Sequence, residues 1–246
     1  MKGLEAFSLI ILFLLSTIGL NAQTVKFVTG EWAPFTSKDI SGQGFVTEIV
    51  LAAAQEAGIR VELFFAPWAR CELMVKSGEA FASFPYVKTE KRQKSFNFSD
   101  TITISYAKVF YYAGFAKEIS WSTLADFLPY RMGAVRGSSD VETLVNAGIK
   151  PIIATDSNAA FGMLKLGRMD YYPENELVAR MSIKNLFPGD VDKFLTLTRP
   201  YSSNSLMLLV SRTYPKSQEL LLKFNSGLAT IRKTGVFQAI QKKYGL

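Results

Sequence analysis

The sequence lacks histidine altogether and has a single cysteine, Cys71. Without histidine, Ser-His-Asp and Cys-His catalytic triads are excluded, and a zinc enzyme is disfavoured. One cysteine can build neither a disulfide framework nor a multi-cysteine metal site. We therefore expect no metal, no cofactor and no catalytic residues. Cys71 stands between Trp68 and Leu73, where a small buried apolar role is expected instead of a reactive thiol.

Long hydrophobic runs are also missing, except within residues 1–22. There Lys2 supplies a positive charge, Phe7 to Leu15 form an apolar segment, and Ala22 ends a small-residue stretch. This pattern predicts a signal peptide cleaved near Ala22. A membrane anchor is the competing interpretation, but the apolar segment is shorter than the ~20 residues that a span needs. We expect a secreted, soluble protein of the periplasm.

The chain has no block of like charges, although it is basic, with 28 Lys and Arg against 21 Asp and Glu and a net charge of +7. The basic residues are scattered along the sequence and form no stripe of the kind that binds nucleic acid. Because export also separates the protein from nucleic acid, no nucleic-acid partner is expected.

Apolar runs alternate with helical patterns along the chain, which is typical of an α/β protein. Without residues 1–22, the chain exceeds the ~100–150 residues of one compact domain, so two lobes are expected. Ser139 and Glu142 fit a capping box at the start of a helix through Val141 and Leu144. The expected strands are 25–28, 61–65, 102–104, 108–113, 132–135 and 206–210, and the other expected helices are 46–57, 70–76, 158–166, 220–231 and 236–244.

Several short motifs follow one another in a fixed order over the first part of the chain. In order they are Thr29-Gly-Glu-Trp-Ala-Pro-Phe35, Gly44-Phe45, Pro67-Trp68, Thr89-Glu-Lys-Arg92 and Phe98-Ser99, and the chain ends in Gly-Val-Phe-Gln-Ala-Ile-Gln-Lys-Lys-Tyr before its last two residues. Five such pieces in order over about ninety residues are hard to obtain by chance. The sequence resembles the bacterial extracytoplasmic solute-binding proteins of family 3, the ABC-transporter amino-acid-binding type.

The resemblance implies the fold of a type II periplasmic binding protein, which is α/β, with a ligand cleft between two lobes. Residues 23–111 together with 206–246 are expected to form lobe 1, and 112–205 to form lobe 2. The implied function is binding of a small carboxylate-bearing metabolite, an amino acid or a related organic acid. The implied partner is an inner-membrane ABC permease, and a monomer is expected.

The resemblance also implies ligand-binding roles for two residues of lobe 1. Arg92 matches the arginine that holds the ligand carboxylate, a task that suits the fixed fork of guanidinium donors. Trp32 matches the aromatic platform, whose face attracts cations and covers apolar area. A surface ion pair for Arg92 and a core position for Trp32 are the alternatives. Trp68 fits a core position and a cleft position equally well.

In lobe 2, Ser138 and Ser139 match a hydroxyl pair at a helix start, where free amides attract anions. Ordinary capping of the helix explains the same residues. Arg136 precedes this turn and adds a cation that many members of the family lack. All three residues are expected at the carboxylate side of the site.

The sequence departs from the family pattern where the family holds the ligand ammonium. Val87 replaces a hydroxyl residue, Pro85 replaces a small residue, and Asn175 replaces a carboxylate. Two of these losses fall on the ammonium side, so we expect a positively charged cleft and a ligand that does not strictly need an amino group. Alternatively, Glu174 or Glu176 takes over the role of the missing acid after a small register shift.

Two other functions remain open from the sequence. An orphan receptor would present its ligand-bound form to a signalling sensor protein, and nothing in the sequence separates this from transport. A cyclohexadienyl-type dehydratase on the same fold would need a positioned general acid. Glu174 or Glu176 could serve, but no second matched acid is evident. We therefore expect a binding protein and no enzyme.

Overall fold

The computed structural model describes residues 24–245 of the chain. The expected signal peptide and its cleavage point lie outside these residues. Among residues 24–245, no helix combines the length and the apolar character that crossing a bilayer requires.

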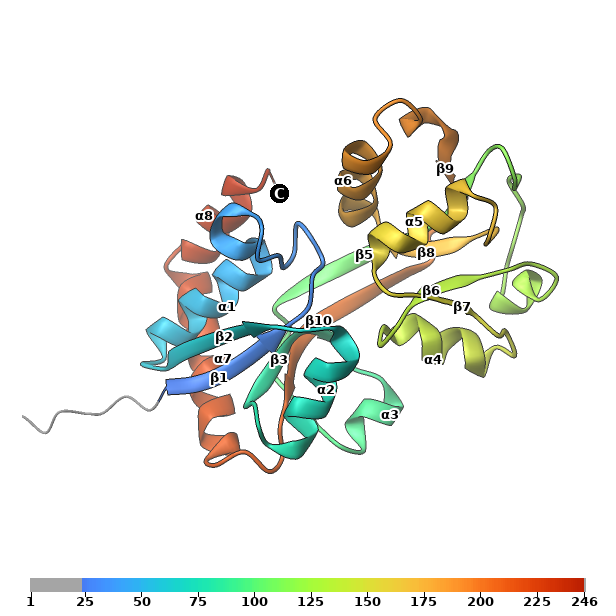
Figure 1. Cartoon of the computed structure of the whole chain (residues 1–246). Coiled ribbons are helices and arrows are strands. Elements are labelled where there is room, and N and C mark those ends of the chain that lie inside the picture. Colours follow the sequence, from blue (N-terminus) through green and yellow to red (C-terminus); the bar gives the residue numbers. More distant parts are fainter. Residues whose placement is uncertain (1–23, 246) are drawn as a thin grey trace, which may run out of the picture.

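Two lobes lie side by side and are joined by two long strands, β5 (Thr103–Tyr112) and β10 (Ser202–Val210) (Figure 1). The first lobe contains both the start and the end of the described chain. Its elements are β1 (Thr24–Thr29), a 3-10 turn (Ser41–Gln43), α1 (Phe45–Glu56), β2 (Arg60–Phe65), α2 (Trp68–Ser77), β3 (Ala82–Val87), α3 (Glu90–Gln93), β4 (Asn97–Phe98), α7 (Ser217–Lys233) and α8 (Val236–Lys243).

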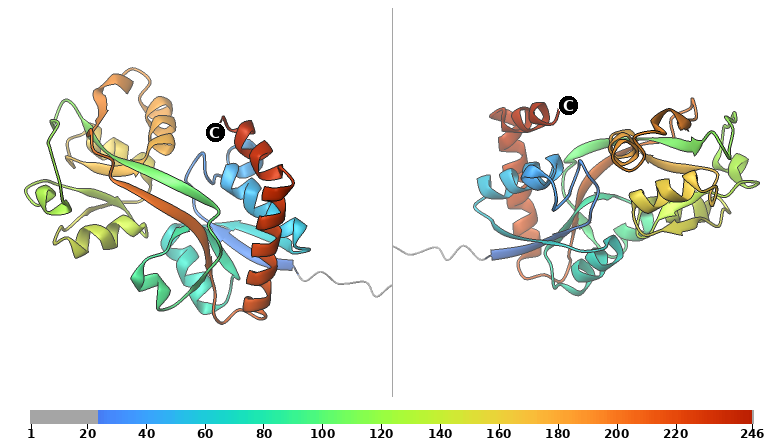
Figure 2. Two further views of the ribbon diagram at one scale, coloured as in Figure 1. Left: turned by 180° about the vertical axis from the view of Figure 1, so that it is seen from behind. Right: turned by 45° about the horizontal axis from the view of Figure 1, so that its top comes forward.

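The second lobe is formed by the middle of the sequence, and Figure 2 shows it from two further sides. Its elements are a 3-10 turn (Leu124–Phe127), β6 (Gly133–Val135), α4 (Ser139–Asn146), β7 (Ile152–Ala154), α5 (Ser157–Lys165), β8 (Tyr172–Asn175), α6 (Glu176–Leu186), a 3-10 turn (Val191–Lys193) and β9 (Phe194–Thr196).

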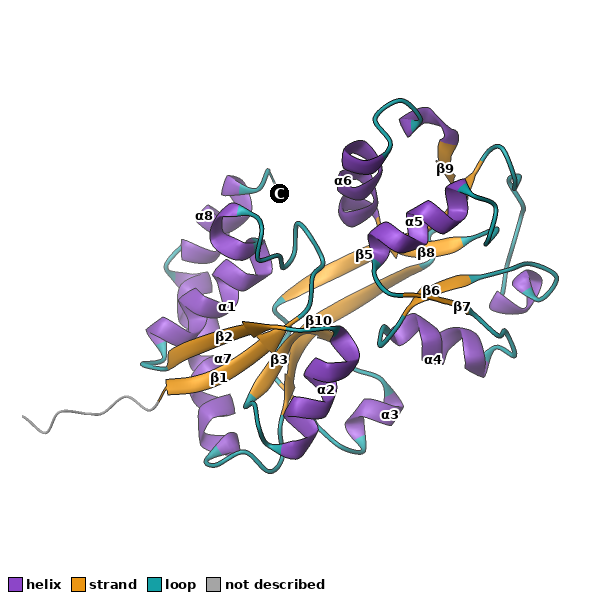
Figure 3. Ribbon diagram, viewed as in Figure 1, coloured by secondary structure: helices purple, strands orange, loops and turns teal. Residues whose placement is uncertain are grey.

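One sheet runs through both lobes in the strand order β2-β1-β3-β10-β5-β8. In the first lobe β1 pairs in parallel with β2 and β3, and β10 lies antiparallel to β3. Between the lobes β5 and β10 pair antiparallel, from Thr103 opposite Leu206 to Ala107 opposite Ser202. The second lobe adds β8 and β9 to β5, and β6 and β7 form a separate parallel pair (Figure 3).

Each lobe has its own apolar core. In the first lobe the core includes Phe27, Phe84 and Ile49 between the sheet and helices α1 and α7, and α2 covers a second cluster around Cys71. In the second lobe Phe161 and Tyr171 belong to clusters under α5, α6 and α4. Two independent cores allow the lobes to move as separate bodies, because few core side chains are shared between them.

The expected strands and helices occur within a few residues of their expected positions, but the capping box at α4 is wrong. Ser138, not Ser139, is the N-cap residue, and its side chain makes no capping hydrogen bond. The carboxylate of Glu142 is turned away from the helix start and accepts a hydrogen bond of 2.9 Å from the Thr89 hydroxyl of the first lobe. A tertiary contact has therefore replaced the local one.

Candidate functional site

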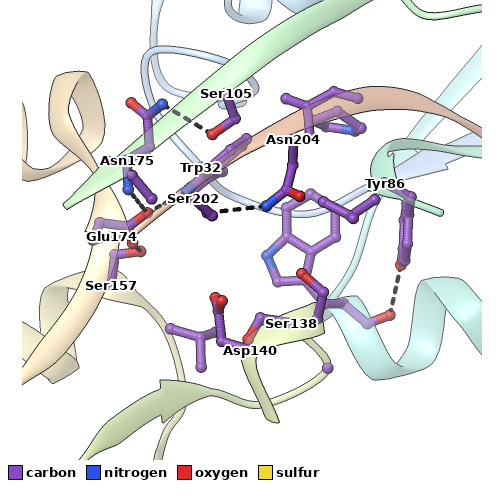
Figure 4. A pocket seen from close by; sticks show the side chains of 18 of the residues that line it. Trp32, Tyr86, Ser105, Ser138, Asp140, Ser157, Glu174, Asn175, Ser202 and Asn204 are labelled. Carbon is purple, nitrogen blue, oxygen red and sulfur yellow. Dashed lines mark hydrogen bonds between the residues drawn. The ribbon is translucent and has the colours of Figure 1, made fainter. Parts of the chain in front are cut away.

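A pocket lies between the two lobes where β3, α3, α4, β8 and the strands β5 and β10 meet. Figure 4 shows the pocket with polar side chains from both lobes directed into it. It is lined by Glu31, Trp32, Trp68, Pro85, Tyr86, Val87, Arg92, Ser105, Ala107, Val135, Gly137, Ser138, Ser139, Asp140, Ser157, Tyr172, Glu174, Asn175, Ser202, Asn204 and Leu206. Aromatic walls with few charged groups are typical of a small-molecule site.

Trp32, which was expected in the cleft, and Trp68, for which the sequence left core and cleft open, both line this pocket. Trp32 is partly buried, stacks on Phe35 with ring centroids 4.2 Å apart, and donates its indole N–H to Glu174 of the second lobe over 3.1 Å. Trp68 begins α2 and packs against core clusters of both lobes. Its ring leaves no room for a side chain at position 30, since a Cβ on Gly30 would lie 2.4 Å from it.

Arg92 lines the pocket, and three of its five N–H groups donate to protein acceptors. Its Nε donates to Glu72 over 3.3 Å, Nη1 to the Val87 carbonyl over 3.1 Å, and Nη2 to the Gly137 carbonyl over 2.8 Å. The guanidinium also lies 4.6 Å from the centre of the Tyr86 ring. Its side chain is buried, so these contacts fix the fork in place and leave two N–H groups for a ligand.

The turn before α4 meets the first lobe closely. Gly137 has a φ of +82°, and a Cβ there would lie 3.0 Å from the Ala69 backbone nitrogen, so only glycine fits without strain. Ser138 and Ser139 line the pocket beside it, and the Ser138 hydroxyl has no hydrogen-bond partner among the described residues. Arg136 is exposed and does not line the pocket, in contrast to its expected position at the site.

Apart from the contacts along the joining strands β5 and β10, three hydrogen bonds of the described residues join the lobes around the pocket: Trp32 to Glu174, Arg92 to the Gly137 carbonyl, and Thr89 to Glu142. The third lies away from the pocket lining, so it is a contact between lobes that a ligand would not touch.

Glu142→Ala should therefore weaken ligand binding modestly, by about 0.5–1.5 kcal/mol, because it removes the acceptor of one hydrogen bond that is made when the lobes meet and leaves Thr89 to cap α3. Titration calorimetry with any ligand of the protein measures this loss. Glu142→Gln keeps an acceptor for Thr89 and is the matched control, with a smaller expected loss. Equal affinity in Glu142→Ala and wild type would show that this bond does not contribute to closure.

Glu174 is buried in the pocket wall, and four donors surround its carboxylate. One oxygen accepts from Trp32 over 3.1 Å and from the Asn175 backbone over 2.7 Å. The other accepts from the hydroxyls of Ser157 and Tyr172, each over 2.5 Å. Burial raises the pKa of Glu174, although the four donors oppose the rise.

The neighbours of Glu174 have structural roles. The side-chain oxygen of Asn175 caps α6 by accepting from Leu177 and Val178, and its NH₂ group donates to Ser105 and to the Tyr106 carbonyl. Glu176 lies outside the pocket lining and pairs with Lys108 and Arg180. Of the two glutamates considered from the sequence, only Glu174 faces the pocket. Val87 and Pro85 both line it as well, without a side-chain hydroxyl.

Asp140 is a pocket residue that the sequence did not single out. It is the second residue of α4, is partly buried and points into the pocket (Figure 4). Burial and the nearby Glu174 carboxylate raise the pKa of Asp140 to about 7. With Glu31 at the exposed rim, the lining contains three acids and one base, Arg92. The expected positive balance of the cleft is therefore wrong, because Arg136 points elsewhere and two acids point inward.

The comparisons with known proteins agree with this geometry. The chain matches the model of the family described as bacterial extracellular solute-binding proteins, family 3, over residues 25–246. No curated protein matches it.

Solved structures similar to this chain have the same two-lobed fold. A histidine kinase sensor domain with similarity to periplasmic binding proteins is 23% identical, with a TM-score of 0.78 over 90% of this chain and 95% of that one. An ancestral arginine-binding protein bound to arginine is 24% identical, with a TM-score of 0.75 over 89% and 97%. A substrate-binding protein of an ABC uptake transporter from Streptococcus pneumoniae with bound histidine is 20% identical, with a TM-score of 0.72 over 89% and 91%. The fold is that of a type II periplasmic binding protein.

Proposed function

Because the chain belongs to the bacterial extracellular solute-binding proteins of family 3, we propose that it is a periplasmic receptor for a small ligand of the amino-acid class. The receptor delivers this ligand to an ABC importer of the inner membrane and catalyses no reaction. The observation that carries the proposal is the pocket between the lobes, to which each lobe contributes charged and aromatic side chains. Several similar structures hold an amino acid, which supports the same ligand class.

Closure of the lobes is the working motion of the proposed receptor. We propose the boundaries expected from the sequence, residues 23–111 with 206–246 against 112–205, with the hinge where β5 and β10 run between the lobes. Two adjacent antiparallel strands can bend together without breaking the rest of the sheet. Ligand binding would stabilise the arrangement in which Arg92 reaches Gly137 and Trp32 reaches Glu174. The closed surface is what a permease would recognise.

A carboxylate on the ligand fits Arg92, which keeps two N–H groups beyond those used by Glu72, Val87 and Gly137. The backbone amides at the start of α4 lie on the opposite wall, beside Ser138 and Ser139. This arrangement supports the carboxylate-bearing ligand proposed from the sequence. The inward acids Asp140 and Glu174 support a positive group on the same molecule.

Presentation of the ligand-bound form to a sensor protein is the second candidate, and the similarity to a histidine kinase sensor domain favours it. Deletion of the gene separates the two functions. Transport predicts slower uptake of the labelled ligand into cells, whereas sensing predicts normal uptake and a lost transcriptional response.

A thermal-shift screen of amino acids, organic acids, amines and small peptides tests the proposed receptor function. A true ligand at 100 times its Kd should stabilise the mature protein by about 2.7 kcal/mol, because it binds only the folded state. Stabilisation should saturate with concentration and be reproduced by calorimetry. If no compound of these classes stabilises the protein, the proposed function is wrong.

A further inference from the structure

The two inward acids of the pocket differ in what surrounds them. The Glu174 carboxylate accepts four hydrogen bonds from the protein, which fills the roughly four lone-pair directions that a carboxylate offers. The negative charge of Glu174 still acts on a ligand, but the carboxylate has no free lone pair to accept a hydrogen bond from it. By contrast, the Asp140 carboxylate accepts no hydrogen bond and forms no ion pair among residues 24–245.

The polar groups closest to Asp140 do not satisfy it. The nearby hydroxyls of Tyr201 and Ser138 and the charge of Arg92 all oppose the rise in the pKa of Asp140. Neither hydroxyl, however, has a hydrogen-bond partner in the described part of the chain. Arg92 donates its hydrogen bonds to Glu72, Val87 and Gly137 and none to Asp140. The Asp140 carboxylate is partly buried and has no cationic partner of its own within the described part of the protein, so a positive group of a ligand beside it would be favourable.

Aromatic rings complete a surrounding suited to an organic cation. The pocket wall includes Trp32 and Trp68, whose ring faces attract positive charge and whose area covers an apolar stem, whereas the Tyr86 ring already carries the Arg92 guanidinium. Asn204 adds a side-chain carbonyl, because its NH₂ group donates to Ser202 over 3.0 Å. Acceptors and ring faces thus gather at one pocket that contains a single basic side chain, Arg92.

We propose that Asp140 is the counter-ion for a positively charged group of the ligand, and that the pocket selects ligands with an ammonium or guanidinium group on a short apolar stem. This inference rests on the proposed receptor function and names the ligand class of the same site. It also moves the cation-holding acid from β8, where the sequence placed it, to the first turn of α4.

A purely local explanation of Asp140 is that an acid in the first turn of a helix interacts favourably with the helix dipole. That effect is electrostatic and needs no hydrogen bond, so it acts on Asp140 whether or not a ligand is present. It does not account for the position of the carboxylate on the pocket wall, where no amide of α4 donates to it. The local effect and a ligand contact also differ in a measurable way, since only the second changes which ligands bind.

The experiment compares lysine with norleucine, which has the same backbone and stem but no terminal ammonium, by calorimetry on the mature protein. Arginine and cadaverine are added as a second basic amino acid and a diamine without a carboxylate. We expect wild type to prefer lysine or arginine over norleucine by at least about tenfold. Asp140→Asn should reduce this preference to about twofold or less, because it removes the charge and keeps the shape.

Two further variants keep the experiment decisive. Asp140→Glu retains the charge and should retain a measurable part of the preference, which a folding defect would not. Glu176→Gln removes a carboxylate of the same lobe that lies outside the pocket lining, and it should change the preference less than twofold. Norleucine binding as tightly as lysine, or an unchanged preference in Asp140→Asn, would overturn the proposal.

The outcomes also separate this inference from the receptor function. If lysine, arginine and cadaverine all fail to bind while another compound in the thermal-shift screen does, the counter-ion role is wrong and the receptor function stands. If no compound in the screen stabilises the protein, both proposals fall together.

Discussion

Replacement of Arg92 by alanine should weaken ligand binding by about 2–5 kcal/mol, the largest effect we expect for a single residue of the pocket. The guanidinium is buried and joins three protein acceptors, one of which, the Gly137 carbonyl, belongs to the opposite lobe. Its loss leaves the Glu72 carboxylate without its partner and removes a bond between the lobes. It also removes the two N–H groups proposed to hold a ligand carboxylate. Titration calorimetry on the folded variant measures the effect.

Two companion variants define what the Arg92 result means. Arg92→Lys keeps the charge but loses the fork, so it should recover only part of the affinity. Arg136→Ala removes an exposed arginine outside the pocket and should change affinity by less than about 0.5 kcal/mol. Unchanged affinity in Arg92→Ala would rule out both the carboxylate contact and a role for this bond in closure.

The fold was readable from the sequence because its elements repeat the periods of helix and strand. Helix α1 buries Val46, Ile49 and Ala53 at helical spacing, and the apolar β1 lies between two parallel neighbours. The family motifs supplied the two-lobed arrangement. Local capping was less predictable, because Glu142 could satisfy either the start of its own helix or Thr89, and only the packing of the lobes decides between them.

The pocket residues that belong to a sequence motif could be predicted, whereas their partners from the opposite lobe could not. Arg92 and Trp32 stand on motifs, and both line the pocket. Their partners, the Gly137 carbonyl and Glu174, come from the other lobe and have no signature in the neighbouring sequence. Arg136 shows the reverse error, since charge and proximity along the chain say nothing about which way a side chain points.

The acids of the pocket show a third limit. All four residues of β8 are buried, so its sequence shows no alternation of polar and apolar residues. Without that alternation, the sequence alone did not indicate that the side chain of Glu174, and not that of Glu176, faces the pocket. The N-cap preference of asparagine was a usable signal for Asn175, because it assigns that residue to the start of α6. Asp140 had no such signal, since acids in the first turn of a helix are common for local reasons.

Removing the Asp140 charge should stabilise the ligand-free protein at high pH, although it weakens binding of the proposed cation. The folded pKa of Asp140 is raised from the ordinary 3.8 to about 7, first by burial and then by Glu174. Between these two values the folded protein binds more protons at this site than the unfolded chain, so its free energy of unfolding falls as pH rises through the window. The destabilisation is complete above about pH 7 and disappears towards pH 4, where both states become protonated.

The difference between 3.8 and about 7 corresponds to at most about 4 kcal/mol. Since Asp140 keeps some contact with water, we expect Asp140→Asn to be more stable than wild type by about 1–3 kcal/mol at pH 8 and by much less at pH 4. Urea unfolding of both proteins without ligand at the two pH values measures this.

Asp170→Asn provides a control of opposite sign. Burial acts to raise the pKa of Asp170, but hydrogen bonds from Arg131 outweigh it and lower the pKa below 3.8. Its carboxylate therefore stabilises the fold above that value, and the variant should be less stable than wild type at pH 8. If Asp140→Asn also proves less stable than wild type at pH 8, then Asp140 has a favourable partner inside the protein. In that case the Asp140 charge stabilises the folded protein, and a structural role explains this residue without any ligand.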